Sequence, residues 1–142
     1  MPKFLDRLAA DRPLIYDGGF GSELFARGIE LTNSTLANEA HPDAVVDIHK
    51  AYIAAGADLI GTNTFVASEL HLEMAGKDPD QAGALTRTAT DLARRAIAES
   101  GRDVLVGGSI GPSPGAIEAD AGSTDFGIAN DRVKTAHQRI IE

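Results

Sequence analysis

Short apolar segments alternate with long amphipathic segments along this chain, and that alternation limits the fold more than any other feature. Residues 13–17, 57–62 and 103–108 are apolar and β-forming, and each segment ends in glycine or small polar residues. Apolar strands separated by helices are typical of parallel sheets, whose faces are covered by helical crossovers. Because right-handed crossovers between sequential strands are strongly preferred, we expect three parallel neighbours in the order 1-2-3.

End signals delimit the helices between these strands. Pro42 suits the first position of a helix over residues 42–56, whose last residue is a glycine suited to a left-handed cap. A second amphipathic helix is expected over residues 78–101, which begin with a capping aspartate and a proline. Residues 113–127 are expected to form an irregular loop, and residues 128–142 a closing helix.

These elements predict an α/β fold with about three βα units in one domain. A complete eight-unit barrel usually takes about 250 residues. The 142 residues of this chain therefore predict either an incomplete (β/α)8 TIM barrel with parallel strands or a small open sheet. The composition, 43% hydrophobic and 24% charged, is that of an ordinary soluble domain.

Charge and hydropathy exclude two classes of partner. Asp and Glu total 21 against 13 Lys and Arg, and no basic block is present, so we expect no nucleic acid. No segment approaches the roughly 20 apolar residues of a membrane span, and charged residues interrupt the N-terminus where a signal peptide would be apolar. We therefore expect a cytoplasmic protein that binds no membrane.

Several chemistries lack the residues they require. The chain has no cysteine, which excludes disulfides, thiolate nucleophiles and any cysteine-bound metal of its own. No lysine lies at a predicted strand end, and the glycines match neither a dinucleotide nor a phosphate-binding fingerprint. The histidines lack metal-ligand spacing, and we expect each to be a surface or helix-capping residue. They are His41, His49, His71 and His137.

All three predicted strand ends carry polar or glycine residues. They are residues 17–21, 62–65 and 108–112. Ligands of parallel α/β folds bind at this edge of the sheet. Asp17 is the only carboxylate there, and a fixed anion suits an amino-acid ammonium group or a proton to be accepted. Each segment alone would equally suit a turn or a cap, but together we expect Asp17, Asn63 and Ser109 to face a common cleft.

The same strand ends, with other segments, resemble one enzyme family. The motifs are Asp17-Gly18-Gly19-Phe20-Gly21, His41-Pro42, Ala55-Gly56-Ala57-Asp58, Thr62-Asn63-Thr64-Phe65 and Gly108-Ser109-Ile110-Gly111-Pro112. In order and spacing they are similar to the homocysteine-binding barrel of the homocysteine S-methyltransferase family, which includes betaine-homocysteine methyltransferase and cobalamin-dependent methionine synthase. The motifs together make the likeness specific across nearly the whole chain.

The resemblance implies a (β/α)8 barrel that transfers a methyl group to the homocysteine thiol, giving methionine. In that family a zinc ion held by three cysteines keeps the thiol deprotonated. Asp17 matches the first-strand aspartate that contacts the homocysteine amino group. The substrate-binding residues that the resemblance implies are Asp17, Gly18, Gly19, Asn63, Thr64, Phe65 and Ser109.

The chain departs from the family at the metal site. The family carries its zinc cysteines and a pocket glutamate on later strands, so we expect residues 1–142 to be the N-terminal part of the homocysteine-binding barrel domain. Zinc belongs to the complete family domain, and none is expected on this chain alone. Expected partners are homocysteine, a methyl donor, and a C-terminal half or a second copy.

Two questions stay open at this level. The donor could be betaine, S-methylmethionine, a methylated thioether or methyl-cobalamin. The alternative function is a non-catalytic binding or assembly module derived from the same barrel, which the lack of cysteine favours. A small α/β hydrolase or lyase is a poorer interpretation, because no nucleophile with a partner base is visible.

Overall fold

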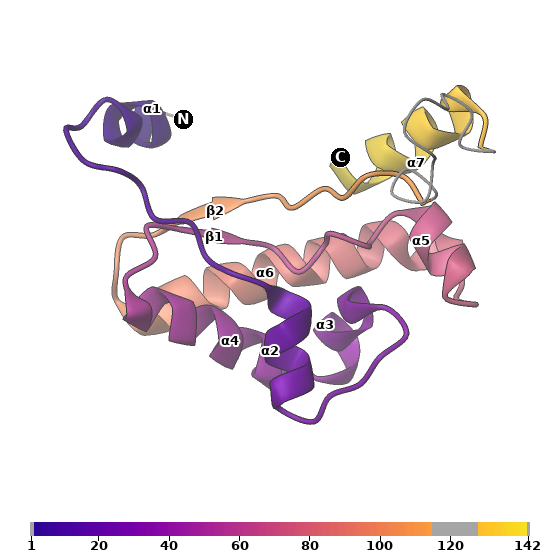
Figure 1. The fold of residues 1–142 in the computed structure, drawn as a ribbon, viewed down its shortest axis with the longest axis horizontal. Coiled ribbons are helices and arrows are strands. Elements are labelled where there is room, and N and C mark those ends of the chain that lie inside the picture. The colour runs from indigo at the N-terminus through magenta and orange to yellow at the C-terminus, as the bar shows by residue number, and fades with distance from the viewer. Residues whose placement is uncertain (1, 115–127, 142) are drawn as a thin grey trace.

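The computed structural model of the chain describes residues 2–114 and 128–141. Its elements in order are α1 (Pro2–Leu8), α2 (Phe20–Ala26), the 3-10 helix η1 (Ser34–Leu36), α3 (Ala37–Ala40), α4 (Pro42–Ala55), β1 (Leu59–Gly61), α5 (Glu69–Met74), the 3-10 helix η2 (Pro79–Gln81), α6 (Ala82–Ser100), β2 (Leu105–Gly107) and α7 (Asn130–Ile141). Figure 1 shows α4 and α6 below the two strands, with α1 and α7 above them at opposite ends. No helix in the described ranges is long and apolar enough to cross a membrane.

The sheet is small and parallel. Strands β1 and β2 pair along their whole length, and Tyr16 joins the other side of β1 by one parallel bridge to Leu59. The parallel order 1-2-3 is therefore confirmed, but the segment expected as a strand over residues 13–17 is only that bridge. The physical reason lies at Ile15, whose backbone N–H donates to the Asp58 carboxylate at 3.1 Å and so leaves the ladder.

Local end signals set the two long helices. Helix α4 begins at Pro42 and ends before Gly56, whose φ of 110° is left-handed. Helix α6 likewise ends before Gly101, with φ of 65°. The sequence predicts that this helix begins at residue 78, but α6 begins at Ala82, because Asp78 caps the separate 3-10 turn η2. Helix α7 matches the closing helix, while the loop expected over residues 113–127 lies almost wholly outside the described residues.

The main apolar core lies between the sheet and helices α4 and α6. Ile60 of β1 and Ile48 of α4 are both 0% exposed, and they pack in one cluster with Ala93 and Ala96 of α6. Burying an aliphatic side chain of this size stabilises the fold by about 1.5–3 kcal/mol. This helical layer therefore holds the strands, and with them the strand ends, in place.

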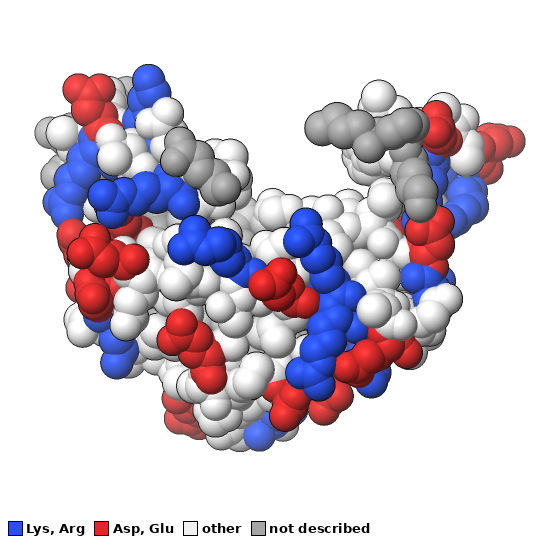
Figure 2. Space-filling model, turned by 180° about the vertical axis from the view of Figure 1, so that it is seen from behind, with Lys and Arg blue, Asp and Glu red and all other residues white. Residues whose placement is uncertain are grey.

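Among the described residues, no further strand pairs with either edge of the sheet. Ile15, on the side of the single bridge, is 53% exposed, and Val106 of β2 is 37% exposed. Figure 2 shows the molecule from behind as an open crescent, with charged side chains on the convex surface and mainly uncharged residues along the concave side. The apolar edges are therefore accessible to another polypeptide.

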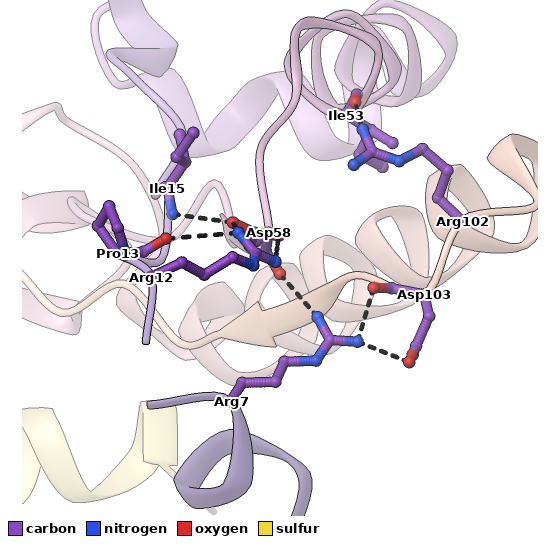
Figure 3. A network of polar contacts seen from close by, with 8 residues as sticks. All are labelled: Arg7, Arg12, Pro13, Ile15, Ile53, Asp58, Arg102 and Asp103. Atoms are coloured by element: carbon purple, nitrogen blue, oxygen red, sulfur yellow. Dashed lines mark hydrogen bonds and ion pairs between the residues drawn. The ribbon is translucent and has the colours of Figure 1, made fainter. Parts of the chain in front are cut away.

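An arginine network joins α1 and the following segment to the N-terminal ends of the strands (Figure 3). Arg12 makes two hydrogen bonds to the Asp58 carboxylate, at 2.7 and 2.9 Å, and holds the pKa of that carboxyl well below its usual range. Arg7 donates to the backbone carbonyl of Asp103 at 2.7 Å and pairs with its carboxylate at 2.6 Å. These contacts cover the end of the sheet at which β1 and β2 begin, opposite the carboxyl ends of the strands.

Candidate functional site

A cleft of about 370 Å3 lies at the carboxyl ends of the strands. Its lining residues are Tyr16, Asp17, Gly18, Gly19, Phe20, Gly21, Ser34, Gly61, Thr62, Phe65 and Ser109. Five residues of the predicted substrate-binding set are among them, namely Asp17, Gly18, Gly19, Phe65 and Ser109. The structure thus brings the three strand ends together around one cavity, while the substrate-binding role stays a prediction.

The Asp17 carboxylate is held rigidly at the first strand end. Its backbone N–H donates to the Leu59 carbonyl at 3.1 Å, and its Oδ2 accepts from the Gly61 N–H at 2.8 Å. Burial raises the pKa of this half-buried carboxyl, and the hydrogen bond from Gly61 opposes that rise. A fixed, partly desolvated acceptor of this kind can bind an ammonium group more strongly than an exposed aspartate can.

The glycines that follow Asp17 rest on helix α4. The Tyr52 hydroxyl donates to the Gly19 carbonyl at 3.0 Å. A methyl group built on Gly18 would lie 2.9 Å from the same hydroxyl oxygen, so a larger residue at this position would have to displace Tyr52. Tyr52 therefore fixes the path of the backbone along one wall of the cleft.

Hydroxyl groups join the second and third strand ends. The Ser109 N–H donates to Thr62 Oγ1 at 3.1 Å, and the Thr64 hydroxyl donates to the Ser109 carbonyl at 2.7 Å. Since Thr64 has given its only proton to that carbonyl, Thr62 is the donor in the 2.7 Å contact between the two threonine hydroxyls. The cleft wall formed by Thr62 and Ser109 is thus fixed by a closed set of hydrogen bonds.

Two predicted residues are separated from the cleft. The Asn63 side chain is buried and donates to the Ser34 carbonyl at 2.8 Å and to Asn38 Oδ1 at 3.0 Å. Thr64 faces a neighbouring cavity that is also lined by Ile140 of α7. Buried amides and hydroxyls need hydrogen-bond partners, and both side chains satisfy this need inside the protein. The cleft expected to be common to Asp17, Asn63 and Ser109 therefore includes only the first and last of these.

Other lining residues were not predicted from the sequence. Tyr16 and Gly61 lie in the paired segments, and Ser34 reaches the cleft from the turn η1. Tyr16 had a usable signal, because it directly precedes the only strand-end carboxylate. Ser34 had none, since its position depends on the path of the chain between α2 and α3.

His49 is the largest departure from the histidine expectations. Its side chain is 0% exposed, not on the surface, and its ring packs against Phe20 with centroids 5.0 Å apart. No described residue hydrogen-bonds either ring nitrogen of His49. Burial lowers its pKa from 6.5 to about 4. His49 is therefore neutral at physiological pH, and its ring supports Phe20, which lines one side of the cleft.

The residues of this chain do not fit the zinc site of the complete family domain. The sequence contains no cysteine, and the described ranges contain no group of three histidines or carboxylates that could hold a metal ion. Structural and catalytic zinc sites take three or four such ligands. No step that depends on zinc can therefore be assigned to residues of this chain.

Comparison with known proteins identifies the family. A family model described as homocysteine S-methyltransferase matches residues 14–142. Betaine-homocysteine S-methyltransferase 1 of Danio rerio is 36% identical over 113 residues, which are 78% of this chain and 28% of that protein. Methionine synthase of Mycobacterium tuberculosis is 34% identical over 136 residues, which are 86% of this chain and 11% of that protein.

A solved structure agrees with these sequence matches. The homocysteine methyltransferase MmuM from Escherichia coli, in its metallated form, superposes with a TM-score of 0.75 at 28% identity. The match covers 96% of this chain and 51% of MmuM, so the chain spans about half the length of that relative. With the family model matched from the first strand segment onward, this chain belongs to the homocysteine S-methyltransferase family.

Proposed function

We propose that this chain forms the homocysteine-binding side of a methyltransferase, and that Asp17 binds the ammonium group of homocysteine. The observation that carries the proposal is a half-buried carboxylate fixed by Gly61 in a cleft at the strand ends. Glycines beside it let a small ligand approach the backbone closely. Membership of the family supports the choice of homocysteine over other amino acids.

The transfer step itself requires groups outside these residues. A free thiol has a pKa of about 8.5 and is mostly protonated at neutral pH. Cysteine-bound zinc would lower that pKa, but the chain has no cysteine. We therefore assign the zinc ligands, and the surface that presents the methyl donor, to polypeptide beyond the 142 residues of this chain.

The open sheet edges are the proposed place where that polypeptide docks. In this proposal the chain is the first part of a (β/α)8 barrel, and a barrel is complete only when every strand has two neighbours. Ile15 and Val106 would then become buried, as apolar side chains of parallel sheets normally are. A second copy of the chain is the competing occupant, and light scattering would detect it as a dimer.

Methyl transfer is expected only when the missing ligands are supplied. The purified chain should form no methionine from homocysteine and a methyl donor, because its thiol substrate stays protonated. Addition of a polypeptide that carries the zinc cysteines should restore methionine formation, measured by chromatography, together with stoichiometric zinc, measured by elemental analysis. Methionine formation by the chain alone would show that thiol activation follows another route.

Asp17→Asn is expected to weaken homocysteine binding by about 10- to 100-fold, because it removes one charge-assisted hydrogen bond. Asparagine can still accept the Gly61 hydrogen bond, so the fold should persist. The affinity would be measured by nuclear magnetic resonance titration of the 142-residue chain under reducing conditions.

The matched control is Asp91→Asn, which removes the same charge from an exposed site on α6, where the side chain is 77% exposed. Its affinity for homocysteine should equal that of the wild type. If Asp17→Asn binds homocysteine as tightly as this control does, Asp17 is not the ammonium site. An absence of binding by the wild type would instead favour the non-catalytic assembly module.

A further inference from the structure

The side chain of Tyr16 lies across the sheet on the cleft side. A methyl group built on Gly61 would overlap the Tyr16 hydroxyl oxygen, and one built on Gly107 would lie 3.8 Å from its ring. The ring therefore extends from the first strand segment over β1 to β2, and the two glycines leave it the room to do so. Tyr16 is half-exposed and lines the cleft, so the exposed face of its ring forms part of the cleft floor.

The Tyr16 hydroxyl lies beside the Asp17 carboxylate. A methyl group built on Gly61, which would overlap the Tyr16 hydroxyl oxygen, would also lie 3.5 Å from Asp17 Oδ1. The two oxygens thus flank one glycine, close enough for a single small ligand to contact both. Within residues 2–114 and 128–141, no group hydrogen-bonds the Tyr16 hydroxyl, so its donor is free for a ligand.

The phenol is held in its donating form. Burial, with the charge of Asp17 nearby, raises the pKa of Tyr16 above its ordinary value of 10.0. At neutral pH the hydroxyl therefore keeps its proton and can donate to an anion. A ligand that fits this corner of the cleft must present a cation to Asp17 and a hydrogen-bond acceptor to Tyr16.

We propose that Tyr16 is a specificity-determining residue whose hydroxyl donates a hydrogen bond to the α-carboxylate of the bound amino acid, while Asp17 binds the α-ammonium. An α-amino acid carries both groups on one carbon, which matches a donor and an acceptor that flank a single glycine. The thiol, at the far end of the side chain, then points away from this corner. This inference rests on the proposed homocysteine site and adds to it the group that recognises the carboxylate.

The test uses Tyr16→Phe with three ligands. They are homocysteine, homocysteine methyl ester, which lacks the carboxylate charge, and 4-mercaptobutanoate, which lacks the ammonium. Tyr16→Phe keeps the ring and should weaken homocysteine and 4-mercaptobutanoate by about tenfold each, but the methyl ester by no more than about twofold. Asp17→Asn should give the complementary pattern and weaken only homocysteine and its ester.

The other tyrosine provides the matched control. Tyr52→Phe removes a hydroxyl that already donates to Gly19, so it should change the three affinities by one common factor. Equal melting temperatures of Tyr16→Phe and wild type would exclude a general loss of structure. Homocysteine affinity that is unchanged in Tyr16→Phe, or an ester weakened as much as homocysteine, overturns the role of Tyr16. No binding of homocysteine by the wild type overturns the proposed function itself.

Discussion

Gly111→Ala is expected to lower the free energy of unfolding by about 3 kcal/mol, at the upper end of what overpacking costs. A methyl group at this position would overlap the Phe65 carbonyl oxygen and lie 3.2 Å from its carbonyl carbon. The Gly111 N–H also donates to that oxygen at 3.1 Å. Both contacted atoms belong to the backbone and cannot rotate away, so the two strand-end loops must separate and lose this hydrogen bond.

The measurement is urea unfolding of the variant beside Gly108→Ala. Gly108 lies in the same loop, nothing is within 4 Å of a methyl group built on it, and its φ is not positive. Gly108→Ala should therefore change the free energy of unfolding by less than about 1 kcal/mol. Equal unfolding midpoints of the two variants would mean that the packing of Gly111 on Phe65 does not contribute to stability.

The cleft depends on the same contact. Ser109 is two residues from Gly111, and its hydrogen bonds to Thr62 and Thr64 need the loop in its present position. A loop that moves to accommodate the Gly111→Ala methyl group takes Ser109 with it. Homocysteine affinity should consequently fall in Gly111→Ala and stay unchanged in Gly108→Ala.

The long elements could be predicted because their signals are local. Pro42 and Gly56 mark the two ends of α4 whatever the rest of the chain does, and both act as expected. The order of the strand segments could also be predicted, since chain connectivity leaves few arrangements of three parallel strands. Asp17 and Ser109 line one cleft for the same reason, because the carboxyl ends of parallel strands lie at the same edge of the sheet. Their role in substrate binding stays a prediction.

The direction of individual side chains could not be predicted. Asn63 lies at a strand end as expected, yet it turns to Asn38 and Ser34, because a buried amide is stable only with hydrogen-bond partners. Those partners come from the turn η1 and helix α3, whose path is set by packing. The position of the Tyr16 ring likewise depends on the absence of a side chain at Gly61, across the sheet.

The short helices α2 and α5 could not be predicted, because their sequences show no clear amphipathic pattern. Helix α2 has 7 residues and α5 has 6, which is too short for an apolar repeat to show a face. Isolated helices of this length are not stable in water, so tertiary contacts must hold them. Leu24 of α2 and Leu72 of α5 provide those contacts, at 2% and 0% exposed.

The burial of His49 could have been predicted. It lies four residues after Val45 and three before Tyr52, on the same apolar stripe of the helix. A histidine at such a position is stable in its neutral form, because burying a charge is costly. Its charged form would need a buried partner of opposite charge. Metal-ligand spacing gives no information on the burial of a histidine, whereas this apolar periodicity does.

Acidification is expected to destabilise the fold through His49 by about 3 kcal/mol. Burial lowers the pKa of His49 in the folded chain to about 4, against 6.5 when it is exposed. Between these values the unfolded chain binds a proton that the folded chain rejects, so stability rises with pH. The contribution of neutral His49 to the free energy of unfolding is complete above about pH 6.5, and it is lost as the pH falls through about 4.

The comparison that isolates this effect is His49→Phe, whose ring can pack against Phe20 without titrating. Urea unfolding of both proteins at a series of pH values from 7.5 to 4 should show the wild type losing about 3 kcal/mol more than the variant. Carboxyl groups such as Asp58 titrate in both proteins and cancel in the difference. His41→Phe, at an exposed position before α4, should follow the wild-type curve. Parallel curves for wild type and His49→Phe would mean that His49 is protonated in the folded chain as readily as in the unfolded one.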